Sequence, residues 1–103
     1  MPHIAIEYDK EKLRYFCRKW KITEFSFFGS VVRDDFGPES DVDVLVTFEE
    51  DAPWSLLSMV HMEDDLVEIF GRPVDLLTRR SIERSRNPIR RESILGNAVS
   101  LEL

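Results

Sequence analysis

The chain has 103 residues and a mass of 12.1 kDa, so we expect residues 1–103 to form a single domain and exclude a two-domain enzyme. Its 43% hydrophobic and 33% charged residues are typical of a soluble folded protein and not of a disordered chain. No apolar run approaches the roughly 20 residues that cross a bilayer, and the N-terminus has no apolar signal core, so we expect a cytoplasmic protein that does not bind membranes. The net charge of −6 argues against binding to duplex nucleic acid.

The first third of the chain predicts a helix, a strand and a short second helix. Residues 9–21 should form the first helix, because Asp9 is a suitable N-cap and four apolar residues follow at helical spacing: Leu13, Phe16, Cys17 and Trp20. The single cysteine, Cys17, excludes an internal disulfide and should fill the core. Residues 22–28 alternate and are rich in aromatics, which favours a strand, and residues 30–35 can form a short helix.

The middle third predicts the central strand and the longest helix. Residues 42–48 are rich in β-branched side chains and apolar on both sides, which is typical of a central strand. Residues 54–70 should form a helix that Gly71 ends, with Trp54 either as an anchor at its start or as an interface residue. The apolar positions at mostly helical intervals in this segment are Leu56, Val60, Leu66, Val67 and Phe70.

The last third predicts two short helices between two strands. The expected elements are a strand over 74–78, a short helix capped by Ser81, a helix over 88–95 and a terminal strand over 99–103. Asn87 followed by Pro88 is an N-cap and first-turn signature, and Gly96 should end that helix. The alternation of helices and strands along the whole chain predicts the α/β class, with a small mixed sheet flanked by helices.

Charge is distributed unevenly along the chain. Residues 1–33 carry seven bases and four acids, residues 34–71 carry twelve acids and no base, and residues 72–103 carry seven arginines and four acids. Most of the acids should lie on solvated loop and helix faces. The arginines from Arg79 to Arg91 are compatible with a solvated helical face, with phosphate contacts or with a docking surface for an acidic partner.

Two carboxylates stand on one face of the central strand. Successive side chains of a strand alternate between faces, so Asp41 and Asp43 point the same way, about 7 Å apart by the usual rise. Their repulsion and desolvation favour a compensating cation, and hard oxygen ligands suit Mg²⁺ or Mn²⁺ with bound phosphate. Upstream, a strand that ends at Gly29-Ser30 and opens a helix presents backbone N–H groups and a hydroxyl to phosphate oxygens.

A third carboxylate, Asp75, lies in an apolar run with no adjacent base, which makes it a candidate metal ligand. If its strand lies beside the strand of Asp41 and Asp43, three carboxylates converge on one site. Such a site can hold two metal ions about 4 Å apart, the arrangement that serves phosphoryl and nucleotidyl transfer.

The spacing of these residues resembles that of a known family. The segment from Gly29-Ser30, across ten residues, to Asp41-x-Asp43 resembles the signature of the polymerase-beta-like nucleotidyltransferase superfamily. The chain length and several flanking residues resemble, more narrowly, the minimal (MNT-type) nucleotidyltransferases; these residues are Arg33, Ser40 and Asn87-Pro88 with Arg91. The resemblance covers nearly the whole chain and implies the nucleotidyltransferase fold.

The resemblance also implies roles for the matching residues. The catalytic carboxylates, which would also ligate Mg²⁺ or Mn²⁺, are Asp41, Asp43 and Asp75. Asp75 would help to deprotonate an acceptor hydroxyl. The residues that would bind the nucleotide are Gly29, Ser30, Arg33 and Ser40. Family members of this type imply transfer of AMP from ATP to a hydroxyl, a tyrosine, of a HEPN-domain toxin, with this chain as the antitoxin.

Two other functions remain open. Where such proteins often have glycine after the arginine, this chain has Asp34-Asp35, which keeps open a binding-only antitoxin that occludes its partner. A nucleotidyltransferase that acts on a small molecule or a nucleic acid is disfavoured by the lack of an acceptor-binding domain and by the net charge of −6. The sequence also leaves open whether the chain is a monomer, a homodimer or stable only in a hetero-complex.

Overall fold

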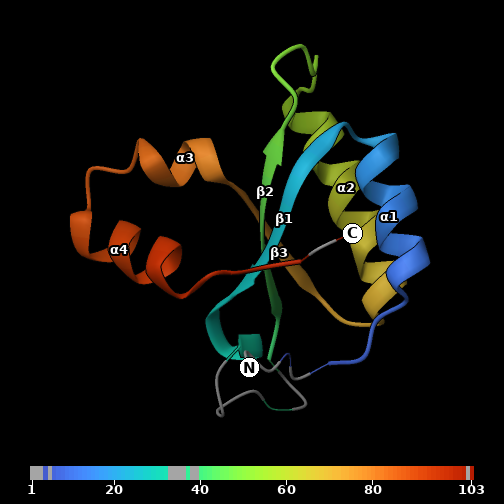
Figure 1. The fold of residues 1–103 in the computed structure, drawn as a ribbon, viewed down its shortest axis with the longest axis horizontal. Helices are drawn as coiled ribbons and strands as arrows, with labels where there is room; N and C mark the ends of the chain where they lie inside the picture. Colours follow the sequence, from blue (N-terminus) through green and yellow to red (C-terminus); the bar gives the residue numbers. More distant parts are fainter. Residues whose placement is uncertain (1–3, 5, 33–36, 38–39, 102) are drawn as a thin grey trace.

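A four-stranded sheet separates two layers of helices in this protein (Figure 1). The computed structural model of the chain describes residues 4, 6–32, 37, 40–101 and 103. The strands are β1 Ile22–Phe28, β2 Val42–Phe48, β3 Val74–Thr78 and β4 Val99–Ser100. Their order in the sheet is β3-β2-β1-β4, with β1 antiparallel to both β2 and β4, and with β2 parallel to β3. The sheet is therefore mixed, as predicted, and β2 lies inside it.

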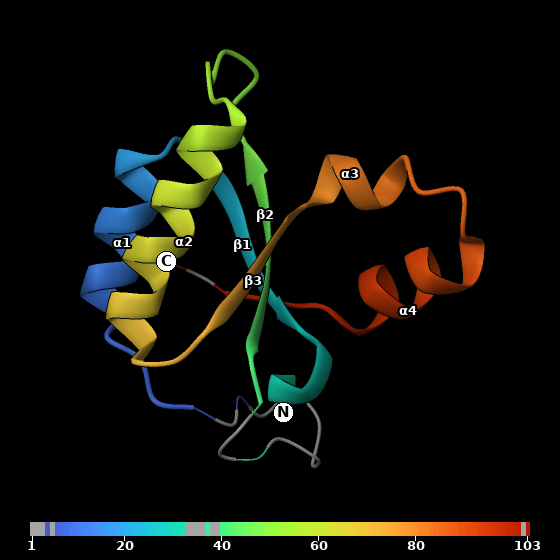
Figure 2. The ribbon, with the colours of Figure 1, turned by 180° about the vertical axis from the view of Figure 1, so that it is seen from behind.

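The helices lie on both faces of this sheet (Figures 1 and 2). The helices α1 Lys10–Lys19 and α2 Leu56–Phe70 cover one face. The shorter α3 Arg79–Glu83 and α4 Pro88–Asn97 pack on the other, and a 3₁₀ helix, η1 Gly29–Val32, follows β1. None of the helices in the described part of the chain is long and apolar enough to span a membrane. The predicted α/β class is confirmed.

The pleat of β2 divides the apolar side chains into two cores. Val42, Val44 and Val46 alternate onto the face of α1 and α2, whereas Leu45 points to the face of α3 and α4. The first core buries Leu13, Phe16, Phe25, Phe27, Val31, Val42, Val44, Val46, Met62, Leu66 and Leu76. The second core is smaller and buries Phe28, Leu45, Ile82 and Ile94. Most of the buried apolar surface therefore lies between the sheet and its two longer helices.

Polar contacts fasten the end of α1 to α2. The Asp65 carboxylate accepts hydrogen bonds from Lys19 Nζ at 3.0 Å and from Trp20 Nε1 at 2.9 Å. Trp54 Nε1 donates to the Trp20 carbonyl at 2.7 Å, and the two indole rings meet edge to face at 5.1 Å. Trp54 thus anchors the start of α2, which is one of the two roles predicted for it, although the helix begins at Leu56 and not at residue 54. Burial alone would raise the pKa of Asp65, but the hydrogen bonds from Trp20 and Lys19 hold that pKa below its ordinary value.

Cys17 fills space beside the first core. Its side chain is half-buried and packs against that core, and burial raises the pKa of its thiol to about 11. A thiol with this pKa is protonated at neutral pH and is a poor nucleophile. The sequence-based expectation of a core filler is confirmed.

The edge strand β3 is tied to α2 by a side chain. The Leu76 N–H donates to Glu63 Oε1 at 3.4 Å, although the ladder of β3 runs only to β2. This N–H therefore points to the open edge of the sheet, where the Glu63 carboxylate covers it.

The start of α3 differs from the prediction. Thr78, the last residue of β3, is the N-cap, because its hydroxyl accepts the Ser81 N–H at 3.1 Å. Ser81, which was expected to cap this helix, therefore lies inside it. Since β3 passes directly into α3, the final strand residue is the first side chain that can reach the free N–H groups of the helix.

The end of α4 also differs from the prediction. Asn87 caps its start and Pro88 opens it, as expected, but the helix continues through Gly96 to Asn97. The Asn97 side chain donates to the Ser93 carbonyl at 2.7 Å, which satisfies one of the last acceptors of the helix and supports an additional turn. Glycine alone therefore does not stop this helix.

Two short elements have bounds other than those predicted. The 3₁₀ helix η1 begins at Gly29, one residue before the helix expected over 30–35, and residues 33–35 of that segment lie outside the described residues. The terminal strand β4 pairs with β1 only over Val99–Ser100, although the Leu101 N–H still donates to the Phe25 carbonyl at 2.9 Å. The strand predicted over 99–103 is therefore too long.

The apolar pattern of α2 does not match its buried face. Met62 and Leu66 are fully buried, but the other apolar positions that made the helix recognisable include three exposed ones: Leu56, Val60 and Val67. Apolar side chains thus occupy two flanks of α2, and the sheet covers only one of them.

We expect Asp65→Asn to lower the free energy of unfolding at pH 7 by about 1–2 kcal/mol, because it weakens hydrogen bonds between a charged carboxylate and Trp20 and Lys19. Folding lowers the pKa of Asp65, so its stabilisation is complete above the ordinary aspartate pKa of about 4 and is lost as the pH falls through the lower folded value. Urea denaturation of the wild type and of Asp65→Asn should therefore show a difference in the free energy of unfolding that shrinks below about pH 4.

The matched control for this substitution is Asp64→Asn, which makes the same change at an exposed position one residue earlier on α2. It should leave the stability within about 0.5 kcal/mol of the wild type. A difference between wild type and Asp65→Asn that stays constant from pH 7 to pH 3 would contradict the assigned role of this carboxylate.

Candidate functional site

The register of the sheet places two predicted site residues side by side. Asp43 of β2 pairs with Asp75 of the parallel strand β3, so both lie on the same face of neighbouring strands, roughly 4.8 Å apart at the backbone. Two residues further along, Leu45 and Leu77 join the second core, so the carboxylates lie on the face of α3 and α4. Asp43 is half-buried, and Asp75 is exposed on the edge strand. The condition stated from the sequence, that the strand of Asp75 lies beside the strand of Asp43, is thus met.

Gly29 lies directly against the Asp43 carboxylate. The residue has a φ of +71°, and a Cβ built on it would stand 2.1 Å from Asp43 Oδ2. Phe28, the residue before it, is the register partner of Asp43 in β1. Only glycine combines a low-energy left-handed backbone with room for the carboxylate, so the turn out of β1 and the position of Asp43 depend on each other.

Asp41 and Ser40 lie just before β2. Asp41 is exposed, and the Val42 N–H that follows it donates to the Pro73 carbonyl at 2.9 Å. The Ser40 hydroxyl accepts the Gly37 N–H at 3.0 Å, while the Ser40 N–H donates to the Gly37 carbonyl at 3.1 Å. Ser40 therefore closes the turn that leads Asp41 and Asp43 into the sheet.

Arg72 is a candidate positioning residue that the sequence analysis missed. Its Nη1 donates to the Gly37 carbonyl at 3.3 Å, so the segment before β3 holds the turn before β2. The signal available in the sequence was that Arg72 is the single base among residues 34–78.

The structure does not bring all predicted site residues together. Ser30 is half-buried in η1 beside Gly29, and Arg33 lies outside the described residues. Within the described ranges, no three His, Cys, Asp or Glu side chains stand close enough to hold a metal ion. The geometry thus joins Gly29, Asp43 and Asp75, and it places Asp41 next to them along the chain.

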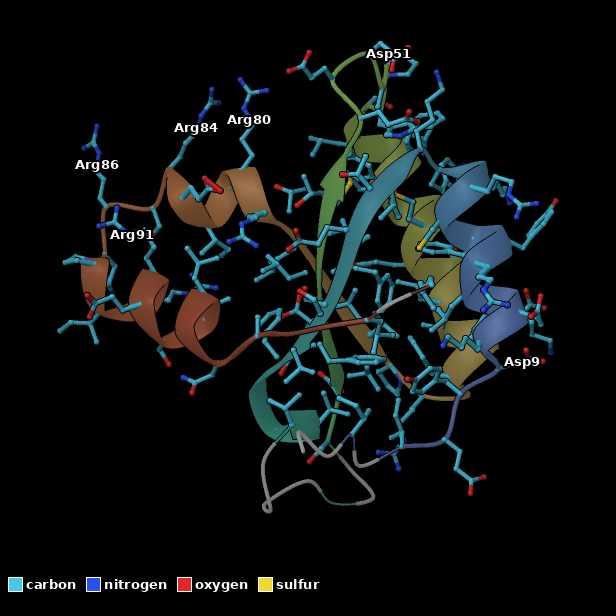
Figure 3. The ribbon with its side chains drawn as sticks, in the orientation of Figure 1. Asp9, Asp51, Arg80, Arg84, Arg86 and Arg91 are labelled. Carbon is cyan, nitrogen blue, oxygen red and sulfur yellow. The ribbon has the colours of Figure 1, made fainter. Side chains whose placement is uncertain are left out.

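The arginines of the last third have different surroundings. Arg79 forms ion pairs with Glu24 of β1 at 2.6 Å and with Glu83 at 3.4 Å. Arg80, Arg84 and Arg86 extend away from the sheet into solvent (Figure 3). Arg79 therefore ties α3 to the sheet, and Arg80 lies near the last residues of β2, at the other end of that strand from Asp43.

The chemical type of the donors at this end of the sheet fits a hard divalent cation, although no three of the described side chains converge on one point. Carboxylate oxygens of Asp41, Asp43 and Asp75 are the ligands that Mg²⁺ and Mn²⁺ prefer. The absence of a Cβ at Gly29 lets the Asp43 carboxylate lie against the backbone of the turn that leaves β1. Such a site can bind a nucleotide phosphate and a metal ion together.

Sequence comparison gives matches along most of the chain. The family model described as "Nucleotidyltransferase domain" matches residues 9–101. A protein of Methanocaldococcus jannaschii, whose name proposes a protein adenylyltransferase, is 36% identical over 92 residues, which are 89% of this chain and 92% of that protein. The protein adenylyltransferase MntA of Thermococcus cleftensis is 39% identical over 74 residues, which are 72% and 70% of the two chains.

Structural comparison finds the same fold in solved proteins. A structure described as that of a proposed minimal nucleotidyltransferase superposes with a TM-score of 0.68 at 31% identity and covers 88% of this chain and 87% of its own. A crystal structure of a toxin-antitoxin with AMP-PNP superposes with a TM-score of 0.61 at 20% identity. The superposition covers 91% of this chain and 73% of the chain in that structure. The nucleotidyltransferase fold predicted from the sequence is confirmed.

We expect Gly29→Ala to destabilise the protein more than Gly71→Ala. Both glycines have a φ of +71°, but a Cβ at Gly71 meets nothing within 4 Å, whereas one at Gly29 meets Asp43 Oδ2. The left-handed backbone should cost each variant about 1–2 kcal/mol, and the overlap should cost Gly29→Ala a further 1–3 kcal/mol. Chemical denaturation of the two variants measures this difference.

Adding Asp43→Ala tests the cause of that difference. In the double variant the nearest Asp43 atom to the new methyl group is the Cβ at 3.4 Å, an ordinary contact. Gly29→Ala should therefore cost about the same as Gly71→Ala in the Asp43→Ala background. If the additional loss persists without the carboxylate, the overlap is not its cause.

Proposed function

Because this chain belongs to the nucleotidyltransferase domain family, we propose that it transfers AMP from ATP to a hydroxyl of a partner protein and acts as an antitoxin. We further propose that the acceptor is a tyrosine of a HEPN-type toxin and that residues 1–103 work as one minimal domain. The observation that carries the proposal is the in-register pair of Asp43 and Asp75 on one face, with Gly29 held against Asp43. The relatives named as protein adenylyltransferases support a protein acceptor.

The carboxylates Asp41, Asp43 and Asp75 are the proposed holders of Mg²⁺ or Mn²⁺. When bound, the ion supplies positive charge that offsets the charge of the triphosphate and of the carboxylates themselves. The residues fit this role because their oxygens are hard ligands and because two of them, Asp43 and Asp75, share one face of adjacent strands. Without a cation, neighbouring carboxylates repel one another.

The chain's own polar groups are proposed to hold the nucleotide. The backbone N–H groups at Gly29 and the hydroxyl of Ser30 would donate to phosphate oxygens, because this turn has no Cβ between it and Asp43. Arg33 would pair with the triphosphate through its planar guanidinium. Ser40 keeps the turn before β2 closed and would act on the nucleotide through the position of Asp41.

Asp75 is the proposed base for the acceptor hydroxyl. It lies exposed on the edge strand, where an acceptor from another protein can approach, whereas Asp43 is half-buried inside the sheet. In the proposed step the acceptor oxygen forms a bond to the α-phosphorus of ATP, the bond from that phosphorus to the oxygen bridging to the β-phosphate breaks, and pyrophosphate leaves. The hydroxyl proton passes to Asp75.

We expect ATP with Mg²⁺ or Mn²⁺ to raise the Tm of the wild type, by the equivalent of about 2.7 kcal/mol when the nucleotide concentration is about 100 times its Kd. Asp41→Asn combined with Asp43→Asn should abolish this rise, because the metal ligands lose their charge. Differential scanning calorimetry measures both. The double variant without ligand should be no less stable than the wild type, since two repelling charges are gone.

Glu49→Gln combined with Glu50→Gln is the matched control for this pair. It removes the same number of negative charges from exposed positions just after the opposite end of β2 and should keep the full nucleotide-dependent rise. An equal rise in both double variants would show that Asp41 and Asp43 do not hold the metal.

We expect Asp75→Asn to weaken ATP binding only modestly while the rate of AMP transfer falls at least about 100-fold, because a general base acts on the chemical step. The assay incubates the protein with ATP, Mg²⁺ and a HEPN-type toxin as the proposed partner, and intact-mass spectrometry detects added AMP. Asp64→Asn, an exposed acid of α2, should transfer at the wild-type rate. A partner that is inhibited but never gains nucleotide mass would replace the enzyme proposal by a binding-only antitoxin.

A further inference from the structure

The outer flank of α2 exposes a row of large apolar side chains. Leu56 is 87% exposed, Val60 52% and Val67 39%, and their spacing of four and seven residues places them on one side of the helix. We call these three residues the α2 stripe. These exposed fractions show that the described part of the chain leaves much of each of the three side chains uncovered. Since isolated exposed apolar residues are common but aligned ones are not, the stripe is a candidate interaction surface.

A hollow continues the stripe at the start of α2. Its volume is about 560 Å³, and Leu56 belongs to both the stripe and the hollow. Apolar side chains line much of it, among them Phe48 of β2, Trp54 of the segment before α2 and Met59 of α2 itself. The combination of a protruding row and an adjoining apolar hollow suits a partner that offers an apolar ridge with one large anchoring side chain.

The charges around the stripe define the chemistry of that partner. The ionised side chains of α2 are all acids: Glu63, Asp64, Asp65 and Glu68. Two of these are engaged within the chain, Asp65 by Lys19 and Trp20, and Glu63 by the Leu76 N–H. Asp64 and Glu68 remain exposed beside the stripe, and Glu49 and Glu50 lie at the hollow opposite a single base, Arg80.

This charge pattern favours a different protein over a second copy of the chain. In a two-fold symmetric contact through α2, each acidic flank would face the same acidic flank of the other copy. Like charges in such a contact oppose association, whereas lysines or arginines on the partner would favour it. The matching surface is therefore an apolar helix edge bordered by basic residues.

We propose that the α2 stripe and its hollow are the docking surface for a helix of the partner protein, with apolar residues on the stripe and basic residues beside Asp64 and Glu68. This inference deepens the proposed function and rests on it in one respect, namely that the docked partner is the protein that accepts AMP. The sheet lies between α2 and the face that carries Asp43 and Asp75. A helix docked on the stripe therefore leaves the carboxylate face open to nucleotide.

The test uses two synthetic helical peptides and the full chain. One peptide carries leucines at intervals of four and seven residues bordered by lysines, and its twin carries glutamates in place of the lysines. Fluorescence anisotropy should show saturable binding of the lysine peptide and at least tenfold weaker binding of the glutamate peptide. Raising the salt concentration should weaken binding of the lysine peptide, because the charges at the border of the contact are exposed.

Substitution then locates the contact. Leu56→Ser combined with Val60→Ser should weaken binding of the lysine peptide at least tenfold. The protein should still fold, because both side chains are exposed. The matched control is Tyr15→Ser combined with Ile89→Ser, which removes side chains that are 67% and 79% exposed on α1 and α4. The control should bind as the wild type does.

The possible results separate this inference from the proposed function. Equal binding of both peptides, absence of binding, or unchanged binding by the Leu56/Val60 variant would each overturn the docking surface. So would a dimer in sedimentation velocity that the same variant dissociates, since the occupant would then be a second copy. The rise in Tm with ATP and Mg²⁺ should be retained in the Leu56/Val60 variant; its absence in the wild type would instead contradict the nucleotide site.

Discussion

The close contact between the Asp43 carboxylate and the backbone of Gly29 is the constraint on which the site depends. A strand of aromatic residues can turn away at its end in many ways, but here the turn must leave room for a carboxylate from the neighbouring strand. Glycine meets that demand at the first position of η1, and Ser30 follows it in that helix. The register of β3 adds Asp75 on the other side. Residues from three segments of the chain thus meet at one end of the sheet, and the contact between two of them, Gly29 and Asp43, requires that residue 29 has no side chain.

Much of the fold was predictable from local patterns, and the differences lie where two local signals compete. The bounds of β1 and β2 follow from β-branched and aromatic residues, and the caps Asp9 and Asn87 act as their sequence indicates. Thr78 and Ser81 are both good N-caps, and only the direct passage from β3 into α3 decides between them. For the site, strand alternation predicted that Asp41 and Asp43 share a face, whereas the pairing of β2 with β3 that brings Asp75 beside Asp43 was left as a condition. The contact of Arg72 with Gly37 depends on tertiary packing, which no local pattern encodes.

The two faces of the sheet offer different chemistry, and this separates two tasks within a small protein. On one side α2 offers apolar and acidic groups, and on the other Asp43 and Asp75 share one face of neighbouring strands. The net charge of −6 does not report this division, because it sums acids and bases over the whole chain. Recognition of a basic helix and recognition of a polyphosphate can therefore proceed without competing for the same surface.

The carboxylate of Glu63 at the open edge of β3 has a consequence for how the protein behaves in a crowded solution. An uncovered strand edge is a template on which further strands can add, and small sheets with such edges grow into insoluble aggregates. By accepting the Leu76 N–H, Glu63 occupies a middle position of the β3 edge with a charged group. Strand addition there would have to displace a hydrogen bond and bury a negative charge. The protein can accordingly offer its helical flank to a partner while its sheet resists joining others of its kind.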